Sequence, residues 1–171
     1  MKNLLRSSVL LLYVMAISSC AEKAEKKTEA SGEEDAVFIV NFEDKPAFEE
    51  YLALNLDDTH PNLLIPENSE ADHAAVLKSW SDLHQRIGSY LAENNFSWGV
   101  EDSSITMLQK IYFEPNGEIK TYFFRIFNEN VSEETKAEFA SLLRDFAVDN
   151  RIEIQRDGNF AQCGKTRYLT N

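Results

Sequence analysis

The fold is decided by one stretch, Met107-Leu108-Gln109-Lys110-Ile111-Tyr112-Phe113, which is followed by Glu114-Pro115-Asn116-Gly117 and by a second run over residues 118–127. Both runs are rich in the aromatic and β-branched residues that favour strands. In the linking segment, proline presets the second turn position, asparagine tolerates the third, and glycine supplies a left-handed residue. The sequence therefore predicts a bulged antiparallel hairpin.

The second run of the hairpin carries apolar side chains at consecutive positions, so both of its faces are apolar. A strand of this kind is usually central in its sheet, or covered on both sides. We expect Tyr112, Tyr122 and Phe124 to share one face of the sheet. Two interpretations are open: these residues form core under a helix at residues 45–56, or they form an exposed aromatic recognition surface.

Residue spacing outside the hairpin predicts three helices and three further strands. Apolar stripes with the period of a helix follow Lys45-Pro46, the N-cap-like segment Ser69–Asp72, and Ser132. Strands are expected at residues 37–42, 151–155 and 165–169. The fold class is therefore α+β: a small, mostly antiparallel sheet that contains the bulged hairpin, with helices packed on it as a two-layer sandwich.

The N-terminal segment has the order of parts that is typical of a secretory signal peptide. Lys2 and Arg6 give it a positive start, and the apolar run over residues 9–17 is too short for a permanent membrane span. The segment ends in Ile17-Ser18-Ser19-Cys20, which resembles the lipobox of bacterial lipoproteins. The resemblance implies cleavage before Cys20 and attachment of acyl chains such as palmitate to that cysteine. The alternative is a plain secreted protein that is cut near Ser19.

An acylated Cys20 would anchor the protein in a bilayer, because two or more acyl chains hold firmly where one holds weakly. Ala21 stands where the inner-membrane retention signal of enterobacterial lipoproteins places aspartate, so the resemblance implies the outer membrane. The expected organisation is a signal peptide at residues 1–19, a lipidated cysteine with a charged flexible linker at residues 20–35, and a single α+β domain at residues 36–171.

The chain is acidic, with a formal net charge of -12. Residues 1–19 carry two positive charges and no acid, so their removal leaves a mature chain at -14. An acidic protein binds nucleic acid poorly, because phosphates attract basic surfaces. It is also expected to stand off from an anionic lipid surface. Solubility is the simplest explanation of the charge.

The later half of the chain has the order helix, hairpin, helix, strand, which resembles the carboxy-terminal domains of TonB and TolA envelope proteins. The matching features are the turn Pro115-Asn116-Gly117, the helix after it and the expected strand at Ile152–Ile154. In those domains a small antiparallel sheet carries helices on one face and pairs its edge with partner proteins. The proline and tryptophan that TonB-like domains carry before the last strand are missing, so the resemblance implies a similar build and not an energy transducer.

No sequence motif for catalysis, phosphate binding or metal binding stands out. His60 lies near Asp57 and Asp58, but the spacing matches no zinc-binding pattern, so we expect no metal and no cofactor. Once Cys20 is acylated, the sequence offers Cys163 as its remaining thiol. We interpret Cys163 as a buried structural thiol, with pairing to another thiol and nucleophilic catalysis as the alternatives.

The sequence thus favours a lipid-anchored, non-enzymatic binding domain of the bacterial cell envelope, with an envelope protein as its expected partner. The candidate interaction surface consists of Tyr112, Tyr122 and Phe124. One alternative is a thiol-dependent enzyme or redox protein that works through Cys163. The other is a structural envelope lipoprotein without a specific ligand.

Overall fold

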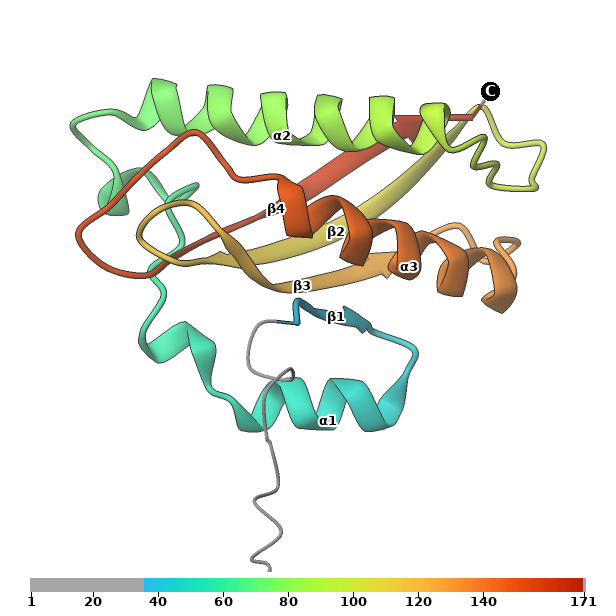
Figure 1. Cartoon of the computed structure of the whole chain (residues 1–171), viewed down its shortest axis with the longest axis horizontal. Helices are drawn as coiled ribbons and strands as arrows, with labels where there is room; N and C mark the ends of the chain where they lie inside the picture. Colours follow the sequence, from blue (N-terminus) through green and yellow to red (C-terminus); the bar gives the residue numbers. More distant parts are fainter. Residues whose placement is uncertain (1–35, 171) are drawn as a thin grey trace, which may run out of the picture. The chain divides into compact units, whose positions relative to one another are not determined.

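The computed structural model describes residues 36–170, which form a four-stranded sheet and three α-helices (Figure 1). These residues belong to one compact unit. The expected signal peptide, Cys20 and the linker up to residue 35 lie outside the described residues. In chain order the elements are β1 Phe38–Asn41, α1 Lys45–Ala53, the short 3₁₀ turns η1 Leu56–Asp58 and η2 Pro66–Asn68, α2 His73–Glu93, β2 Ser104–Phe113, β3 Ile119–Ile126, α3 Glu133–Asp149 and β4 Phe160–Leu169.

The sheet has the strand order β1-β3-β2-β4. β2 pairs antiparallel with both β3 and β4, whereas β1 pairs parallel with β3. The predicted α+β class, the mostly antiparallel sheet and the hairpin of β2 and β3 are therefore confirmed. β3 is a central strand, as the apolar residues on both of its faces predicted.

The hairpin contains a bulge, because the pairing of β2 with β3 shifts by one residue between Tyr112 and Phe113. One extra residue on β3 moves every side chain beyond it to the opposite face. Tyr122 therefore lies on the same face as its partner Ile111, and Phe124 lies with it, opposite to Tyr112. The expectation that Tyr112, Tyr122 and Phe124 share one face is wrong for this reason.

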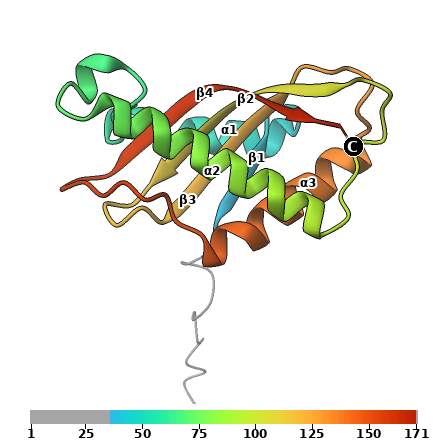
Figure 2. The same ribbon diagram turned by 90° about the horizontal axis from the view of Figure 1, so that it is seen from above.

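Helices cover both faces of the sheet (Figures 1 and 2). α2 and α3 pack on the face of Tyr122, with α2 over β4 and α3 over β1. α1 packs on the opposite face, where the Tyr51 ring stacks on Phe123 at 5.3 Å and lies 5.9 Å from the ring of Tyr112. On the β1 side, α1 therefore adds a third layer to the expected two-layer sandwich. The reason is that β3 is apolar on both faces, and each apolar face is buried under a helix.

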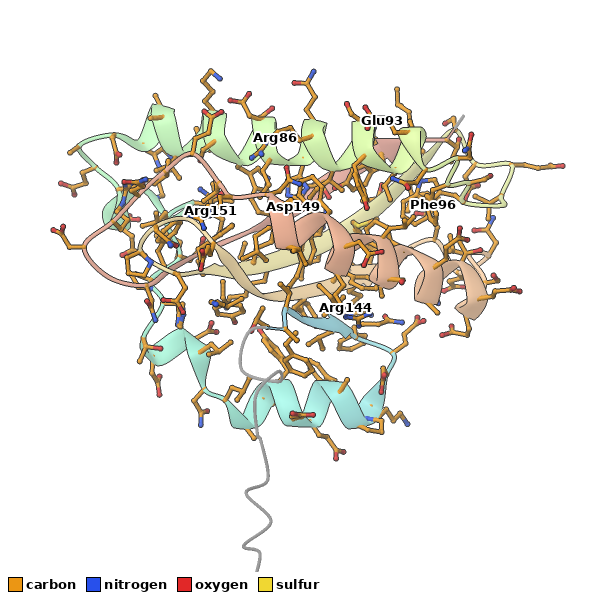
Figure 3. The ribbon with its side chains drawn as sticks, viewed as in Figure 1. Arg86, Glu93, Phe96, Arg144, Asp149 and Arg151 are labelled. Carbon is orange, nitrogen blue, oxygen red and sulfur yellow. The ribbon has the colours of Figure 1, made fainter. Side chains whose placement is uncertain are left out.

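The main core lies between the sheet and the pair of helices α2 and α3. The rings of Phe139, Trp98 and Phe124 meet there, with centroids about 5 Å apart. Arg86 links α2 to the residues just after α3, since its Nη1 donates to Asn150 Oδ1 at 3.2 Å and its Nη2 to the carbonyl of Arg151 at 2.6 Å. Figure 3 shows Arg86 on α2 and Arg151 just beyond the end of α3.

The start of α2 differs from the sequence prediction, whereas the start of α3 agrees with it. α2 begins at His73, four residues after Ser69. The Ser69 hydroxyl is held by the preceding loop, because it donates to the carbonyl of Leu63 at 2.8 Å. In α3 the predicted cap forms: Ser132 Oγ accepts the backbone N–H of Thr135 at 3.1 Å.

The last part of the sheet also differs from the prediction. Residues 151–155 form a single bridge, Glu118 with Arg151, instead of a strand. Ile152 and Ile154 are buried, as their alternation predicted. The edge of β2 is taken by β4, which begins at Phe160, five residues earlier than expected, and no free edge of β2 is left for residues 151–155. The strand that supported the resemblance to TonB-like domains is therefore absent from the described chain.

Candidate functional site: the open half of the sheet

One half of the sheet, on the face opposite to α2, carries no helix of the described chain. Neighbouring strands present side chains there in two rows. The first row is Arg125, Leu108 and Lys165, which are register partners across β3, β2 and β4. The second row is Phe127, Thr106 and Arg167, because Phe127 donates its N–H to the Thr106 carbonyl and Thr106 pairs with Arg167. These six residues are called the open face below.

The open face is positively charged. Arg125, Lys165 and Arg167 are exposed, and none of them lies within salt-bridge distance of a carboxylate in residues 36–170. Beside them, the Phe127 side chain is 41% exposed. Exposed apolar surface next to unpaired charge is typical of a binding surface. The whole chain has a net charge of -12, but the open face is locally positive.

Aromatic rings hold two of these cations in place. The Arg125 guanidinium lies 4.3 Å from the ring centroid of Phe42 and 5.5 Å from that of Phe127. Lys165 Nζ also lies 5.5 Å from the Phe127 ring. Cation–π attraction orders the side chains without neutralising their charge. Binding of a ligand then costs less conformational entropy in the protein, because the cationic side chains are already positioned.

A group of hydrogen bonds closes one end of the open face. Asp57 of η1 forms a salt bridge with Lys110 and accepts the Tyr112 hydroxyl at 2.8 Å. The Tyr112 oxygen lies 2.6 Å from the hydroxyl of Tyr51 on α1. Partial burial would raise the pKa of Asp57, but the hydrogen bonds from Lys110 and Tyr112 outweigh burial and the pKa lies below its usual value. Asp57 is therefore ionised and neutralises Lys110.

Cys163 lies beside this group on β4, as the register partner of Lys110. Its side chain is half-buried. Burial raises the pKa of the Cys163 thiol above its usual value, although Lys110 acts in the opposite direction. A thiol that is protonated at neutral pH is a weak nucleophile. The hypothesis of a reactive Cys163 stays a prediction, which maleimide labelling of the native protein would test.

The aromatic surface predicted from the sequence is buried. Tyr112 is 1% exposed, under α1 and η1, whereas Tyr122 and Phe124 are fully buried on the α2 and α3 side. Of the two interpretations left open by the sequence, the core interpretation agrees with this burial. The three side chains are divided between two cores because the bulge reverses the faces of β3.

Sequence reasoning missed the cations of the open face. A signal for them was present: Lys165 and Arg167 are two residues apart on one strand, and so share a face. Arg125 lies between Phe124 and Ile126 on β3. Only the pairing of β3 and β4 with β2 brings it next to the other two, and that pairing joins residues about forty positions apart.

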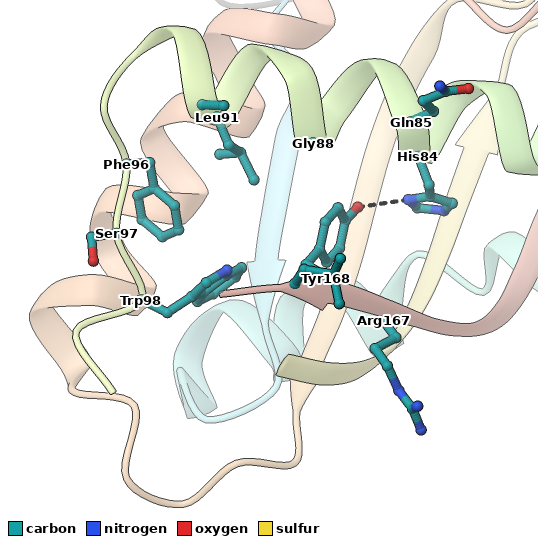
Figure 4. Close-up of a pocket in the computed structure, with 11 residues that line it drawn as sticks. His84, Gln85, Gly88, Leu91, Phe96, Ser97, Trp98, Arg167 and Tyr168 are labelled. Atoms are coloured by element: carbon teal, nitrogen blue, oxygen red, sulfur yellow. Dashed lines mark hydrogen bonds between the residues drawn. The ribbon is translucent and has the colours of Figure 1, made fainter. Parts of the chain in front are cut away.

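A second polar group lies inside the core under α2 (Figure 4). Tyr122 donates to Gln109 Oε1, and the Gln109 amide nitrogen lies 3.5 Å from the Tyr168 hydroxyl. That hydroxyl lies 2.7 Å from Nδ1 of His84. Next to this chain of hydrogen bonds is a pocket of about 300 Å³, lined on one side by Trp98. The Nε2 atom of His84 is buried without a hydrogen-bond partner.

The burial of His84 predicts a pH dependence of stability. Burial lowers the pKa of His84 to about 3, from 6.5 in the unfolded chain. The unfolded chain therefore takes up a proton below pH 6.5 while the folded protein does not, so stability falls as the pH drops from 6.5 toward 3. Between pH 7 and pH 4.5 we expect His84 to account for a loss of about 2 kcal/mol in unfolding free energy.

His84→Gln should remove this contribution while keeping a hydrogen bond to Tyr168. Urea denaturation of the wild type and the variant at both pH values measures the difference. An equal loss of stability on acidification in the two proteins would show that His84 is not buried in its neutral form.

The described chain offers no metal site: within residues 36–170, no three His, Cys, Asp or Glu side chains come together as ligands. His60 Nδ1 lies 2.9 Å from the carbonyl of Leu56 and 2.9 Å from Thr59 Oγ1. Helices long and apolar enough to cross a membrane are also not found in this range.

No protein-family model matches the chain, and neither curated proteins nor solved structures give a match. The open face is therefore interpreted from its own chemistry.

Proposed function

We propose that this protein is a lipid-anchored lipoprotein of the bacterial cell envelope, in the outer membrane, whose domain binds an acidic partner through the open face and catalyses no reaction. The anchor is supported by the sequence Ile17-Ser18-Ser19-Cys20 after the positively charged and apolar segments. Binding is supported by the exposed and unpaired cations next to Phe127.

The observation that carries the proposal is the grouping of Arg125, Lys165 and Arg167 on one face of an acidic chain. Arg125 and Lys165 are separated by one strand, and Arg167 lies two residues from Lys165. Like charges this close repel one another, and water and salt reduce this repulsion only in part. An anionic ligand removes the repulsion on binding, so the cations contribute more to the complex than to the free protein.

Photo-crosslinking in cells tests the proposal on the full chain. A photoreactive amino acid is placed at Phe127, on the open face, or at Val148, which is 74% exposed on α3. We expect adducts from position 127 and not from position 148. The double variant Arg125→Glu/Arg167→Glu should abolish them, because it reverses the charge that attracts the partner. The matched variant Lys78→Glu/Arg144→Glu changes the net charge equally on α2 and α3 and should leave them intact (Arg144 in Figure 3).

Acylation of Cys20 is tested in the same cells. Labelled palmitate should enter the wild-type chain and not the Cys20→Ser variant. A wild-type chain that takes up no label contradicts the lipoprotein assignment. Adducts that form equally at positions 127 and 148, or that survive charge reversal of the open face, contradict the binding assignment.

A further inference from the structure

We propose that the partner of the open face is an acidic amphipathic helix of another protein, which packs beside α1 and completes the helix layer on that side of the sheet. This inference rests on the proposed binding function and names its partner class. It starts from an asymmetry of the fold: two helices cover one face of the sheet, and one helix of the described chain covers the other.

The uncovered half has the dimensions of one helix. On the far face, α3 occupies the β1 side and α2 occupies the β4 side. On the near face, α1 packs on β1 and on Phe123 of β3, and the open face lies beyond it toward β4, without a helix of the described chain over it. Two strand spacings amount to about 10 Å, which is the diameter of a helix with its side chains. The stretch of β4 beyond the closed end of the open face, from Lys165 to Leu169, spans about 13 Å, which matches about nine residues of helix.

The side chains of the open face specify the surface of that helix. Leu108 lies between Arg125 and Lys165 in one row, so an apolar stripe of the partner would cover Leu108 with cations on both sides. Lys165 and Arg167 are about 6.6 Å apart along β4, a spacing close to that of two acids at positions i and i+4 of a helix. Phe127, with 41% of its surface exposed, extends the apolar contact.

A flat anionic surface fits this region less well. α1 rises from the same face of the sheet, where it contacts Phe123, and a helix is about 10 Å thick. A bilayer would therefore meet α1 before it reached Leu108. A helix lies beside α1 without this obstacle, as α2 lies beside α3 on the far face.

Binding of a designed probe tests the inference on the full chain, with the substitution Cys20→Ser to prevent acylation. The probe is a stapled 15-residue helical peptide with leucines on one stripe and glutamates on both flanks. We expect Arg125→Glu/Arg167→Glu to weaken its binding at least tenfold, and Lys78→Glu/Arg144→Glu to leave it unchanged. Chemical shift changes in the bound protein should centre on Leu108, Thr106 and Phe127. Before the titration, cooperative urea unfolding of every variant shows that it is folded.

Two further probes separate this inference from the proposed function. A linear peptide of the same composition with a central proline cannot form the helix. If it binds as tightly as the stapled peptide, the helix inference is overturned while the acidic-partner proposal stands. Phosphatidylglycerol vesicles that compete with the stapled peptide would instead assign the face to lipid. Self-association of the protein that charge reversal abolishes would assign it to a second copy, and both of these results also overturn the inference.

Discussion

Gly117→Ala should lower the free energy of unfolding by about 3 kcal/mol. Gly117 has a φ of +85°, a left-handed conformation that costs a residue with a Cβ about 1–2 kcal/mol. A Cβ at this position would also lie 2.4 Å from the carbonyl oxygen of Ile152. The two segments cannot separate freely, because the N–H of Ile152 donates to the Gly117 carbonyl at 3.0 Å.

The substitution therefore affects more than the hairpin turn. To make room for the methyl group, the segment after α3 must move away from the turn, although Ile152 and Ile154 are buried in the core. Urea denaturation followed by circular dichroism measures the change. Gly158→Ala is the matched control, since a Cβ there meets nothing within 4 Å, and its effect should stay below about 0.5 kcal/mol. Equal effects of the two substitutions would contradict the close approach of Gly117 to Ile152.

Phe139→Ala should lower the free energy of unfolding by about 4 kcal/mol. The Phe139 side chain is fully buried, and its ring lies 5.0 Å from Trp98, 5.1 Å from Phe124 and 6.4 Å from Tyr168, measured between centroids. It therefore joins α3 to β3, to β4 and to the segment after α2. Removal of the ring leaves a cavity that these neighbours cannot fill, since each belongs to a different element.

The contact with Trp98 offers a second measurement, because the indole fluorescence should change in the folded Phe139→Ala protein. Val148→Ala on the same helix is the control: this side chain is 74% exposed, and alanine favours a helix more than valine does. We expect Val148→Ala to be neutral or slightly stabilising. A loss of less than about 1 kcal/mol in Phe139→Ala would show that the ring is not central to the core.

The elements that could be predicted from the sequence are those specified by neighbouring residues. Pro115, Asn116 and Gly117 determine the turn between β2 and β3 within four positions. Ser132 and the acids after it specify the start of α3 through hydrogen bonds within one helical turn. Ser69 offers the same local signal, but α2 begins four residues later, and Ser69 instead ends the 3₁₀ turn η2, with its N–H donating to the Pro66 carbonyl and its hydroxyl to the Leu63 carbonyl. A local signal predicts the start of a helix only where the surrounding segments leave the backbone free to form it.

The candidate site depended on tertiary structure more than the elements did. A bulge of one residue sends Tyr122 and Phe124 away from Tyr112, which removes the surface that the sequence suggested. The same pairing brings Arg125 of β3 into one row with Lys165 of β4. Composition counts charges without placing them, so the net charge gave no sign of this cluster of cations.

The sequence by itself determined the fold class, the hairpin and the helices, because turn chemistry, caps and apolar periodicity act over a few residues. It also supports the proposed lipid anchor, which lies outside the residues that the structure describes. Only the tertiary structure decided which charges become neighbours and which half of the sheet carries no helix of residues 36–170. The reason is that strand register and helix placement are set by pairing between residues far apart in the chain, and a shift of one residue exchanges the two faces of a strand.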